Sequence, residues 1–273
     1  MGKELVITSA ENEQLKLVRS LKQRKHREAR GKMLVEGVRF LEEALAAGVR
    51  LELAVYSPRV LAGQRGQGLL EAVRQKSPMI LLVSDALMDK LAGTDSPQGI
   101  LAVAGIPTFR LEDLEVRAAS CLVVLDGLQD PGNLGTIMRT AVAAGAGGLI
   151  LGKGTVDLYN PKVLRATMGA IFRLPALAGV ALPQALGWLQ ERGVRLVAAD
   201  PRGARYYFEE DYTRPTAFLI GNEGSGLSAE VLSLAQARVA IPMAPGVESL
   251  NAAVSAGLLM YEAVRQRHRI SSP

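Results

Sequence analysis

The 273-residue sequence predicts an α/β protein with two domains, and three observations support that fold class. Short apolar runs typical of strands alternate with longer segments of helical periodicity. A stretch of scattered charge around Pro107 separates two such series. Several apolar runs of the second series end in polar or Gly-rich loops, as in open sheets that bind ligands. We therefore expect an N-terminal α/β domain over residues 1–105, a linker over 106–117 and a C-terminal domain over 118–273.

The N-terminal domain is expected to begin with a helix over residues 11–28, where Leu15, Leu17, Val18 and Leu21 form an apolar stripe. The other elements follow from apolar runs and from the glycines that end helices. They are strands over 33–35, 51–56, 80–83 and 99–104, and helices over 37–47, 68–76 and 85–91.

The C-terminal domain shows a clearer pattern. An apolar strand over 121–125 leads through a polar loop over 126–132 into a helix over 134–145. The later elements are expected as strands over 148–151, 195–199, 217–220 and 239–241, with helices in the intervals and a last helix over 250–268. Strands that alternate with helices imply a mostly parallel sheet with helices on both faces.

The net charge of +5 is concentrated in one half of the chain. Residues 1–110 hold 17 Lys and Arg against 12 Asp and Glu, whereas residues 111–273 hold 15 of each. A solvated helix face would explain an isolated basic run, but the asymmetry favours a surface that contacts RNA phosphates. The densest cluster comprises Lys22, Arg24, Lys25, Arg27, Arg30 and Lys32.

The composition excludes several classes of protein. The sequence has no apolar run near the roughly 20 residues that cross a bilayer, and its N-terminus lacks the apolar stretch of a secretory signal. The single cysteine, Cys121, lies in an apolar run, which fits a buried residue in the reducing cytoplasm. Two histidines and one cysteine are too few for a His-Cys zinc site or a Ser-His-Asp triad, so no metal is expected.

The loop after the first C-terminal strand does not carry a known nucleotide fingerprint. Gly127, Gly132 and Gly135 lack the dinucleotide-binding spacing. Asn133 also stands where a phosphate-binding loop requires lysine. We therefore do not expect a nicotinamide-dependent dehydrogenase.

Three loops that each follow an apolar strand carry the functional prediction. They cover residues 125–139, 219–228 and 241–257. Strands of an open α/β sheet present their C-terminal ends at one edge, where ligands collect. Small residues in these loops would let backbone groups approach a ligand directly.

Together these loops resemble the three signature motifs of the SpoU/TrmH family of SPOUT-class RNA 2′-O-methyltransferases. The matching residues are Asn133, Gly135 and Arg139 in the first loop, Gly221–Leu227 in the second, and the Ile-Pro-Met and Ser-Leu-Asn segments at 241–243 and 249–251 in the third. The resemblance is strong over about 120–265 and weaker over 1–105, which is similar to the family's ribosomal-protein-like substrate-binding domain. The third motif departs slightly, with Pro245 and an Ala252-Ala253 pair where valine is frequent.

The resemblance implies a fold and partners that periodicity does not indicate. It implies a deep trefoil knot in the C-terminal domain, a homodimer formed through that domain with the active site near the subunit interface, and S-adenosylmethionine as cofactor. The residues expected to hold the cofactor are Leu219, Gly221, Ile241, Met243 and Leu250.

Five residues are expected to carry the chemistry, each beside a simpler interpretation. Asn133 is either the N-cap of its helix or a residue that orients substrate or arginine. Arg139 is either solvated or the central catalytic residue; because arginine stays protonated, we expect it to hold a phosphate and stabilise the developing 2′-alkoxide. Glu223 is a solvent-facing acid or a structural anchor. Ser249 and Asn251 are helix-start residues, or they align the attacking hydroxyl.

The sequence therefore predicts an S-adenosylmethionine-dependent methyltransferase that acts on a ribose 2′-hydroxyl, with ribosomal RNA favoured. Three alternatives stay open. The first is a transfer RNA ribose methyltransferase and the second an RNA base methyltransferase of related fold. The third is a catalytically silent protein of RNA binding or ribosome assembly.

Overall fold

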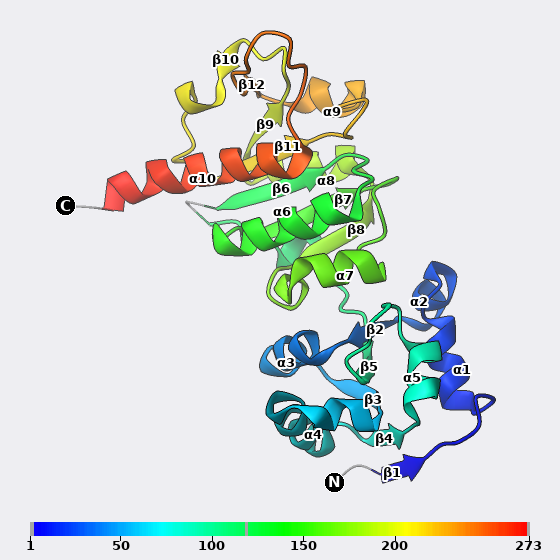
Figure 1. Ribbon diagram of the computed structural model, residues 1–273. Helices are drawn as coiled ribbons and strands as arrows, with labels where there is room; N and C mark the ends of the chain where they lie inside the picture. Colours follow the sequence, from blue (N-terminus) through cyan, green and yellow to red (C-terminus); the bar gives the residue numbers. More distant parts are fainter. Residues whose placement is uncertain (1–2, 118–119, 272–273) are drawn as a thin grey trace. The chain divides into compact units, whose positions relative to one another are not determined.

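The computed structural model describes residues 3–117 and 120–271 (Figure 1). The chain forms two compact units, which we call the N-terminal unit (residues 1–107 and 159–172) and the C-terminal unit (108–158 and 173–273). Residues 159–172, which the sequence analysis assigned to the C-terminal domain, thus pack with the N-terminal unit. In the described part of the chain no helix is both long and apolar enough to cross a membrane.

The N-terminal unit is built on a mixed five-stranded sheet in the order β1-β4-β3-β5-β2. β1 and β3 pair with β4 in parallel, whereas β5 is antiparallel to both β3 and β2. The strand that the sequence analysis missed is β1, a short edge strand with mostly exposed residues. The bounds are β1 Lys3–Val6, β2 Lys32–Glu36, β3 Leu51–Tyr56, β4 Met79–Leu82 and β5 Ile100–Gly105.

Helices cover both faces of this sheet. β5 shows the division, because Ile100, Ala102 and Ala104 pack in one hydrophobic cluster while Leu101 and Val103 pack in the other. α3 and α4 supply buried side chains to the first cluster, and α1 and α5 supply them to the second. The bounds are α1 Glu13–Ser20, α2 Arg24–Arg30, α3 Val38–Ala46, α4 Gln64–Lys76 and α5 Asp85–Leu91.

The single helix predicted over residues 11–28 is wrong, because the structure has two helices there. Asn12 caps α1 by accepting a hydrogen bond from the backbone N–H of Gln14. The Arg27 side chain then reaches back from α2 and donates to the carbonyl oxygens of Leu21 and Lys22, both at 2.8 Å. Carbonyls at a helix end need such donors, so Arg27 stabilises the break between α1 and α2.

Residues 159–172 join the N-terminal unit through packing of their side chains. This segment contains α7 (Pro161–Thr167), and its Tyr159 and Phe172 pack against the cluster under α3 and α4. The Phe172 ring stacks on Phe40 with 4.9 Å between centroids. Met168, which ends α7, has a left-handed backbone conformation with φ of 50°.

The C-terminal unit contains a seven-stranded sheet in the order β10-β12-β9-β11-β6-β7-β8, and every pairing in it is parallel. This confirms the predicted parallel sheet. Two of its strands were not predicted, β8 and the two-residue edge strand β10. The bounds are β6 Cys121–Leu125, β7 Gly148–Gly152, β8 Ala176–Val180, β9 Arg195–Ala199, β10 Arg205–Tyr206, β11 Thr216–Ile220 and β12 Ala237–Ala240.

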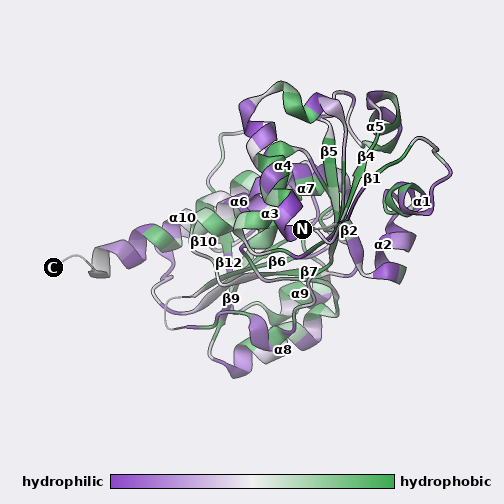
Figure 2. Ribbon diagram, turned by 90° about the horizontal axis from the view of Figure 1, so that it is seen from below, coloured by the Kyte–Doolittle hydropathy of each residue, from purple (hydrophilic) through white to green (hydrophobic). Residues whose placement is uncertain are grey.

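Helices lie on both faces of this sheet (Figure 2). α8 and α9 cover one face, whereas α6 and α10 pack together on the other, with α10 against β6 and β11. The bounds are α6 Pro131–Ala143, α8 Leu182–Glu191, α9 Ala229–Leu234 and α10 Ala252–Ser271. Short 3₁₀ turns occur at Pro58–Ala62, Leu111–Asp113, Ala170–Phe172 and Tyr207–Glu209.

Candidate active site

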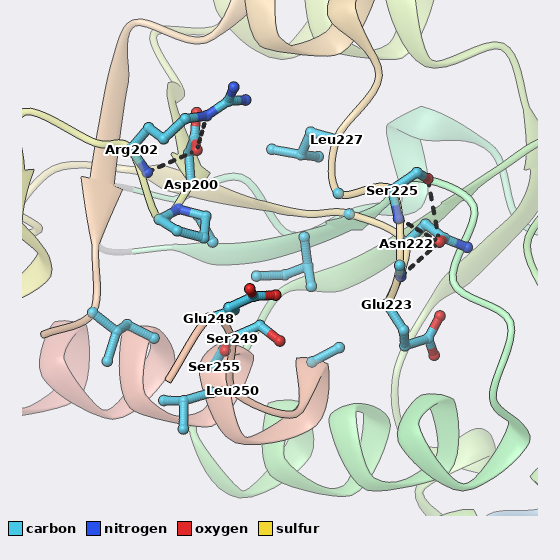
Figure 3. Close-up of a pocket in the computed structure, with 18 of the residues that line it drawn as sticks. Asp200, Arg202, Asn222, Glu223, Ser225, Leu227, Glu248, Ser249, Leu250 and Ser255 are labelled. Carbon is cyan, nitrogen blue, oxygen red and sulfur yellow. Dashed lines mark hydrogen bonds and ion pairs between the residues drawn. The ribbon is translucent and has the colours of Figure 1, made fainter. Parts of the chain in front are cut away.

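A cavity of about 390 Å³ opens at the C-terminal ends of β9, β11 and β12 (Figure 3). The parallel register explains its position, because these three neighbouring strands all end at the same edge of the sheet. Side chains of the second and third loops close it. The lining residues are Ala199, Asp200, Pro201, Arg202, Ile220, Gly221, Asn222, Glu223, Gly224, Ser225, Gly226, Leu227, Leu232, Val239, Ile241, Met243, Glu248, Ser249, Leu250, Ala252 and Ser255.

The second loop folds back on itself tightly. The backbones of Asn222 and Gly226 donate to each other at 3.0 Å, and the Asn222 side-chain oxygen accepts the backbone N–H of both Gly224 and Ser225 (Figure 3). A Cβ atom on Gly221 would lie 2.2 Å from the carbonyl carbon of Gly226, so only glycine fits there. The turn itself needs the positive φ of 70° at Gly226.

Asn222 and Ser228 of the second loop both bond to the first loop. The Asn222 side-chain amide donates to the carbonyl of Gly127 at 2.9 Å. The backbone N–H of Ser228 donates to the carboxylate of Asp126 at 2.8 Å. Asn222 and Asp126 were not among the residues singled out from the sequence, although each stands directly after a predicted strand or inside a quoted motif.

Glu223 is the main anchor between the two loops. Its carboxylate accepts hydrogen bonds from the backbone N–H groups of Gln129 and Asp130, both at 3.0 Å, and from the side-chain amide of Asn133 at 2.9 Å. Desolvation raises the pKa of Glu223, but the hydrogen bonds from these three donors together lower it by a larger amount. The pKa therefore lies below its ordinary value. The ionised carboxylate therefore holds the first loop in place.

Asn133 extends this network to the third loop. The Asn133 side-chain oxygen accepts a hydrogen bond from the Asn251 amide at 2.8 Å. Asn133 is 9% exposed, so its amide bonds are largely shielded from water. The network thus runs Glu223–Asn133–Asn251. Its two bonds join residues that are 90 and 118 positions apart in the chain.

The capping interpretations of Asn133 and Ser249 are wrong. Asp130 is the N-cap of α6, where its carboxylate accepts the backbone N–H of Asn133 at 2.7 Å. The side-chain oxygen of Asn251, not Ser249, accepts the N–H groups of Ala253 and Val254 at the start of α10. Ser249 instead lines the cavity.

Arg139 lies apart from this network. It is an exposed residue of α6, and its side chain makes no hydrogen bond or ion pair within residues 3–117 and 120–271. It is not among the residues that line the cavity. Its neighbour Thr140 faces Gly257 of α10, where an added Cβ would lie 3.7 Å from the Thr140 methyl. Arg139 thus lies exposed on α6, one residue before the position that packs against α10.

Four of the five predicted cofactor residues line the cavity, namely Gly221, Ile241, Met243 and Leu250. The fifth, Leu219, does not. Successive residues of a strand point to opposite faces, and the Leu219 side chain is fully buried in the hydrophobic cluster under α8. Its neighbour Ile220, at the end of β11, lines the cavity in its place.

The predicted basic cluster divides into buried and exposed members. Arg27 is only 4% exposed and bonds to backbone carbonyls, so we remove it from the candidate RNA contacts. Lys22 donates to the carbonyl oxygens of Lys90 and Ala92, and Lys32 pairs with Glu52 at 2.5 Å. The exposed members are Arg24, which pairs with Glu28, together with Lys25 and Arg30.

Three charged residues of the cavity wall were not predicted from the sequence, although Glu223 was. Asp200 and Arg202 follow β9, and Glu248 precedes α10 (Figure 3). The signal for Asp200 was its position directly after a predicted strand, as in the other three loops. Within the described residues no group of three or more His, Cys, Asp and Glu side chains is arranged to hold a metal ion.

Comparison with known protein families divides the chain much as its packing does. Residues 120–261 match the SpoU rRNA Methylase family, and residues 12–102 match the MRM3-like substrate binding domain. The two matches fit the structure, in which three motif loops converge on one edge of a parallel sheet. They define the class of protein as an RNA methyltransferase. The chain belongs to the SpoU rRNA methylase family.

Individual relatives agree along nearly the whole chain. An uncharacterised tRNA/rRNA methyltransferase of Synechocystis sp. is 39% identical, over 98% of this chain and 96% of the relative. The 23S rRNA (uridine(2479)-2'-O)-methyltransferase of Streptomyces viridochromogenes is 36% identical, over 89% and 86%. The crystal structure of the SpoU methyltransferase AviRb from that organism, in complex with AdoMet, matches with a TM-score of 0.87 at 34% identity, over 96% of this chain and all of that one.

Proposed function

We propose that this protein is an S-adenosylmethionine-dependent methyltransferase that modifies a ribose 2′-hydroxyl of ribosomal RNA. The observation that carries the proposal is the Glu223–Asn133–Asn251 chain of hydrogen bonds, which gathers the three motif loops at the edge of one cavity. The names of the relatives point the same way, because two of them are 23S rRNA 2'-O-methyltransferases of Streptomyces viridochromogenes and Bacillus subtilis.

The cavity suits the proposed cofactor. Its volume falls within the range of small-molecule sites, and its wall combines apolar side chains such as Ile241 and Leu250 with exposed backbone at Gly221. When bound, S-adenosylmethionine supplies a methyl group activated by a sulfonium, which becomes a neutral thioether after transfer. The acidic groups at the wall also match a cationic ligand.

The side chains around the cavity edge would position the acceptor. Ser249 lines the cavity directly, and the amides of Asn133 and Asn251 stand behind it in a fixed arrangement. Hydrogen bonds from these groups would align the ribose hydroxyl with the methyl group, and alignment alone contributes a large part of catalysis in such reactions. Arg139 would hold the adjacent phosphate and stabilise negative charge that develops on the 2′-oxygen.

We also propose a homodimer formed through the C-terminal unit, because Arg139 lies outside its own cavity. α10 presents an exposed apolar stripe of Val254, Leu258 and Tyr261, which are 51%, 36% and 50% exposed. Their spacing places them on one face of α10, the helix that packs against the Arg139-bearing α6. A second copy that covered this stripe would remove it from water and bring Arg139 towards an RNA bound at the partner's cavity.

Two further features belong to the proposal. The C-terminal unit would contain the trefoil knot that the family resemblance implies. The N-terminal unit would bind the RNA, with Arg24, Lys25 and Arg30 as phosphate contacts, in accord with the substrate-binding family matched by residues 12–102. A cytoplasmic location remains a prediction.

Methylation mapping tests the function. RNA from a strain without this protein should lack one methylated nucleotide, and restoring the gene should make the adjacent phosphodiester resistant to alkali, which marks a ribose. Loss of a mark in transfer RNA, or on a base, would select those alternatives. Arg139→Ala should nearly abolish transfer but keep S-adenosylmethionine affinity by calorimetry. Absence of any binding by the unaltered protein would favour a silent RNA-binding protein.

A further inference from the structure

The cavity wall has more acidic than basic side chains. Three acids line it, Asp200, Glu223 and Glu248, against a single basic residue, Arg202. The Glu223 carboxylate accepts three hydrogen bonds that hold the first loop. Asp200 uses only one of its two carboxylate oxygens in such bonds, so part of its charge is available to a ligand.

Asp200 is a buried acid with spare bonding capacity. It follows β9 directly and is only 7% exposed. Its Oδ1 accepts the backbone N–H of Arg202 at 3.0 Å and lies 3.5 Å from the Arg202 Nε. Its other oxygen, Oδ2, makes no hydrogen bond within the described residues. This oxygen is therefore free to face a cationic group of a ligand in the cavity.

Arg202 only partly offsets this charge. The Arg202 side chain is 85% exposed, so water and salt screen its guanidinium. The Asp200 side chain is 7% exposed and lines the cavity, so its charge is screened less. Glu248 comes from the opposite part of the wall, in the segment before α10 (Figure 3). Its side chain makes no hydrogen bond or ion pair in the described part of the chain, but Glu248 is exposed, so water and salt screen its charge more than that of buried Asp200. The cavity therefore carries excess negative charge from two separate walls.

We propose that Asp200 and Glu248 let this cavity distinguish the methyl donor from its product by charge. This inference rests on the proposed function, in which the cavity holds S-adenosylmethionine. The donor carries one net positive charge, since its sulfonium adds to a balanced ammonium and carboxylate. The product, S-adenosylhomocysteine, carries none. An acidic wall attracts the net positive charge of the donor and not the neutral product, so it favours exchange of the spent cofactor for a new donor molecule.

Electrostatics sets the size of the effect. A unit charge facing another across a hydrated protein cavity changes affinity by roughly 3- to 10-fold. Removing one carboxylate should therefore lower the preference for donor over product by about that factor, and removing both should lower it further. Groups common to the two molecules, such as the adenine and the amino-acid moiety, cancel in the ratio.

Calorimetry on the full-length protein tests the inference. We would measure Kd for S-adenosylmethionine and S-adenosylhomocysteine with the unaltered protein, Asp200→Asn, Glu248→Gln and the double variant. We expect donor affinity to fall while product affinity changes little, and the ratio of the two Kd values to shift roughly 3- to 10-fold per site. Arg202→Gln is the matched control of opposite sign, and it should increase the preference for the donor.

Two results would overturn the inference in different ways. An equal loss of affinity for both ligands would mean that Asp200 and Glu248 bind a shared group, such as a ribose hydroxyl or the ammonium. An unchanged ratio in the double variant would mean that the wall charge plays no part. If Ser255→Trp, which fills the cavity, left the binding of both ligands intact, the cofactor assignment itself would fail instead. Circular dichroism and thermal unfolding identify any variant that does not fold.

Discussion

Replacing Glu223 by glutamine should loosen the first motif loop without changing the shape of the side chain. In Glu223, Oε1 accepts from Asp130 and Asn133, and Oε2 accepts from Gln129. Glutamine keeps one acceptor oxygen, so its NH₂ group must face at least one N–H donor. A hydrogen bond to a charged group contributes about 1.5–3 kcal/mol, and partial exposure places this one near the lower end. We expect a loss of about 2 kcal/mol, which lowers Tm by about 4–8 °C for a protein of this size.

The pH dependence of this variant follows from the direction of the pKa shift. The pKa of Glu223 lies below its ordinary value of 4.5, so the ionised form favours the folded protein. That contribution is complete above the unfolded pKa and disappears as the pH falls through the lower folded value. The unaltered protein should therefore lose stability on acidification below about pH 5, and Glu223→Gln should lose less over the same range.

Thermal and urea unfolding between pH 3 and pH 7, with transfer kinetics at pH 7, would measure both effects. Asn133 and Asn251 depend on Glu223 for their position, so kcat should fall by roughly 100-fold, with KM for the cofactor nearly unchanged. Glu191→Gln, an exposed change at the end of α8, is the matched control. An unaltered Tm and kcat in Glu223→Gln would refute the anchoring role.

Three further predictions concern other parts of the molecule. Burial raises the pKa of Cys121 to about 12 despite the opposing charge of Arg267, so a thiol reagent at pH 8 should label Cys121 only after unfolding; rapid labelling of the folded protein would contradict its burial. Tyr261→Glu places a charge in the apolar stripe of α10 and should convert a dimer into monomers in sedimentation equilibrium, whereas an unchanged mass would place the interface elsewhere. Lys25→Ala with Arg30→Ala should lower the slope of log Kd for RNA against log salt by about 2, and an unaltered slope would show that these side chains do not touch phosphates.

The parallel core of the C-terminal unit could be predicted from the sequence because its strands are buried on both faces. Such strands read as continuous apolar runs, and the Cys-Leu-Val-Val-Leu segment of β6 is buried along its whole length. β8 was missed because its Ala-Leu-Ala-Gly-Val segment has little β propensity. The break between α1 and α2 was missed because a side chain stabilises it, and the apolar stripe runs on through Leu21.

The candidate site was predictable as a set of loops but not as a network. Composition and strand position selected the right segments, yet the bonds from Asn133 to Glu223 and Asn251 join residues far apart in the chain. The choice of Leu219 instead of Ile220 shows a second limit, since a shift of one residue along a strand turns the side chain to the other face. Asp200 belongs to no quoted motif, and its position directly after a predicted strand was the one signal in the sequence that could have selected it.

The inclusion of residues 159–172 in the N-terminal unit has a consequence for how this protein can be taken apart. The polypeptide passes between the units three times, at residues 107, 158 and 172, so it is not two modules joined by one tether. A fragment that began at residue 108 would expose Tyr159 and Phe172 to water, and an exchange of the first 105 residues with a relative would separate Phe40 from its stacking partner. Any transplant of the N-terminal unit must carry the matching surface of α7 with it.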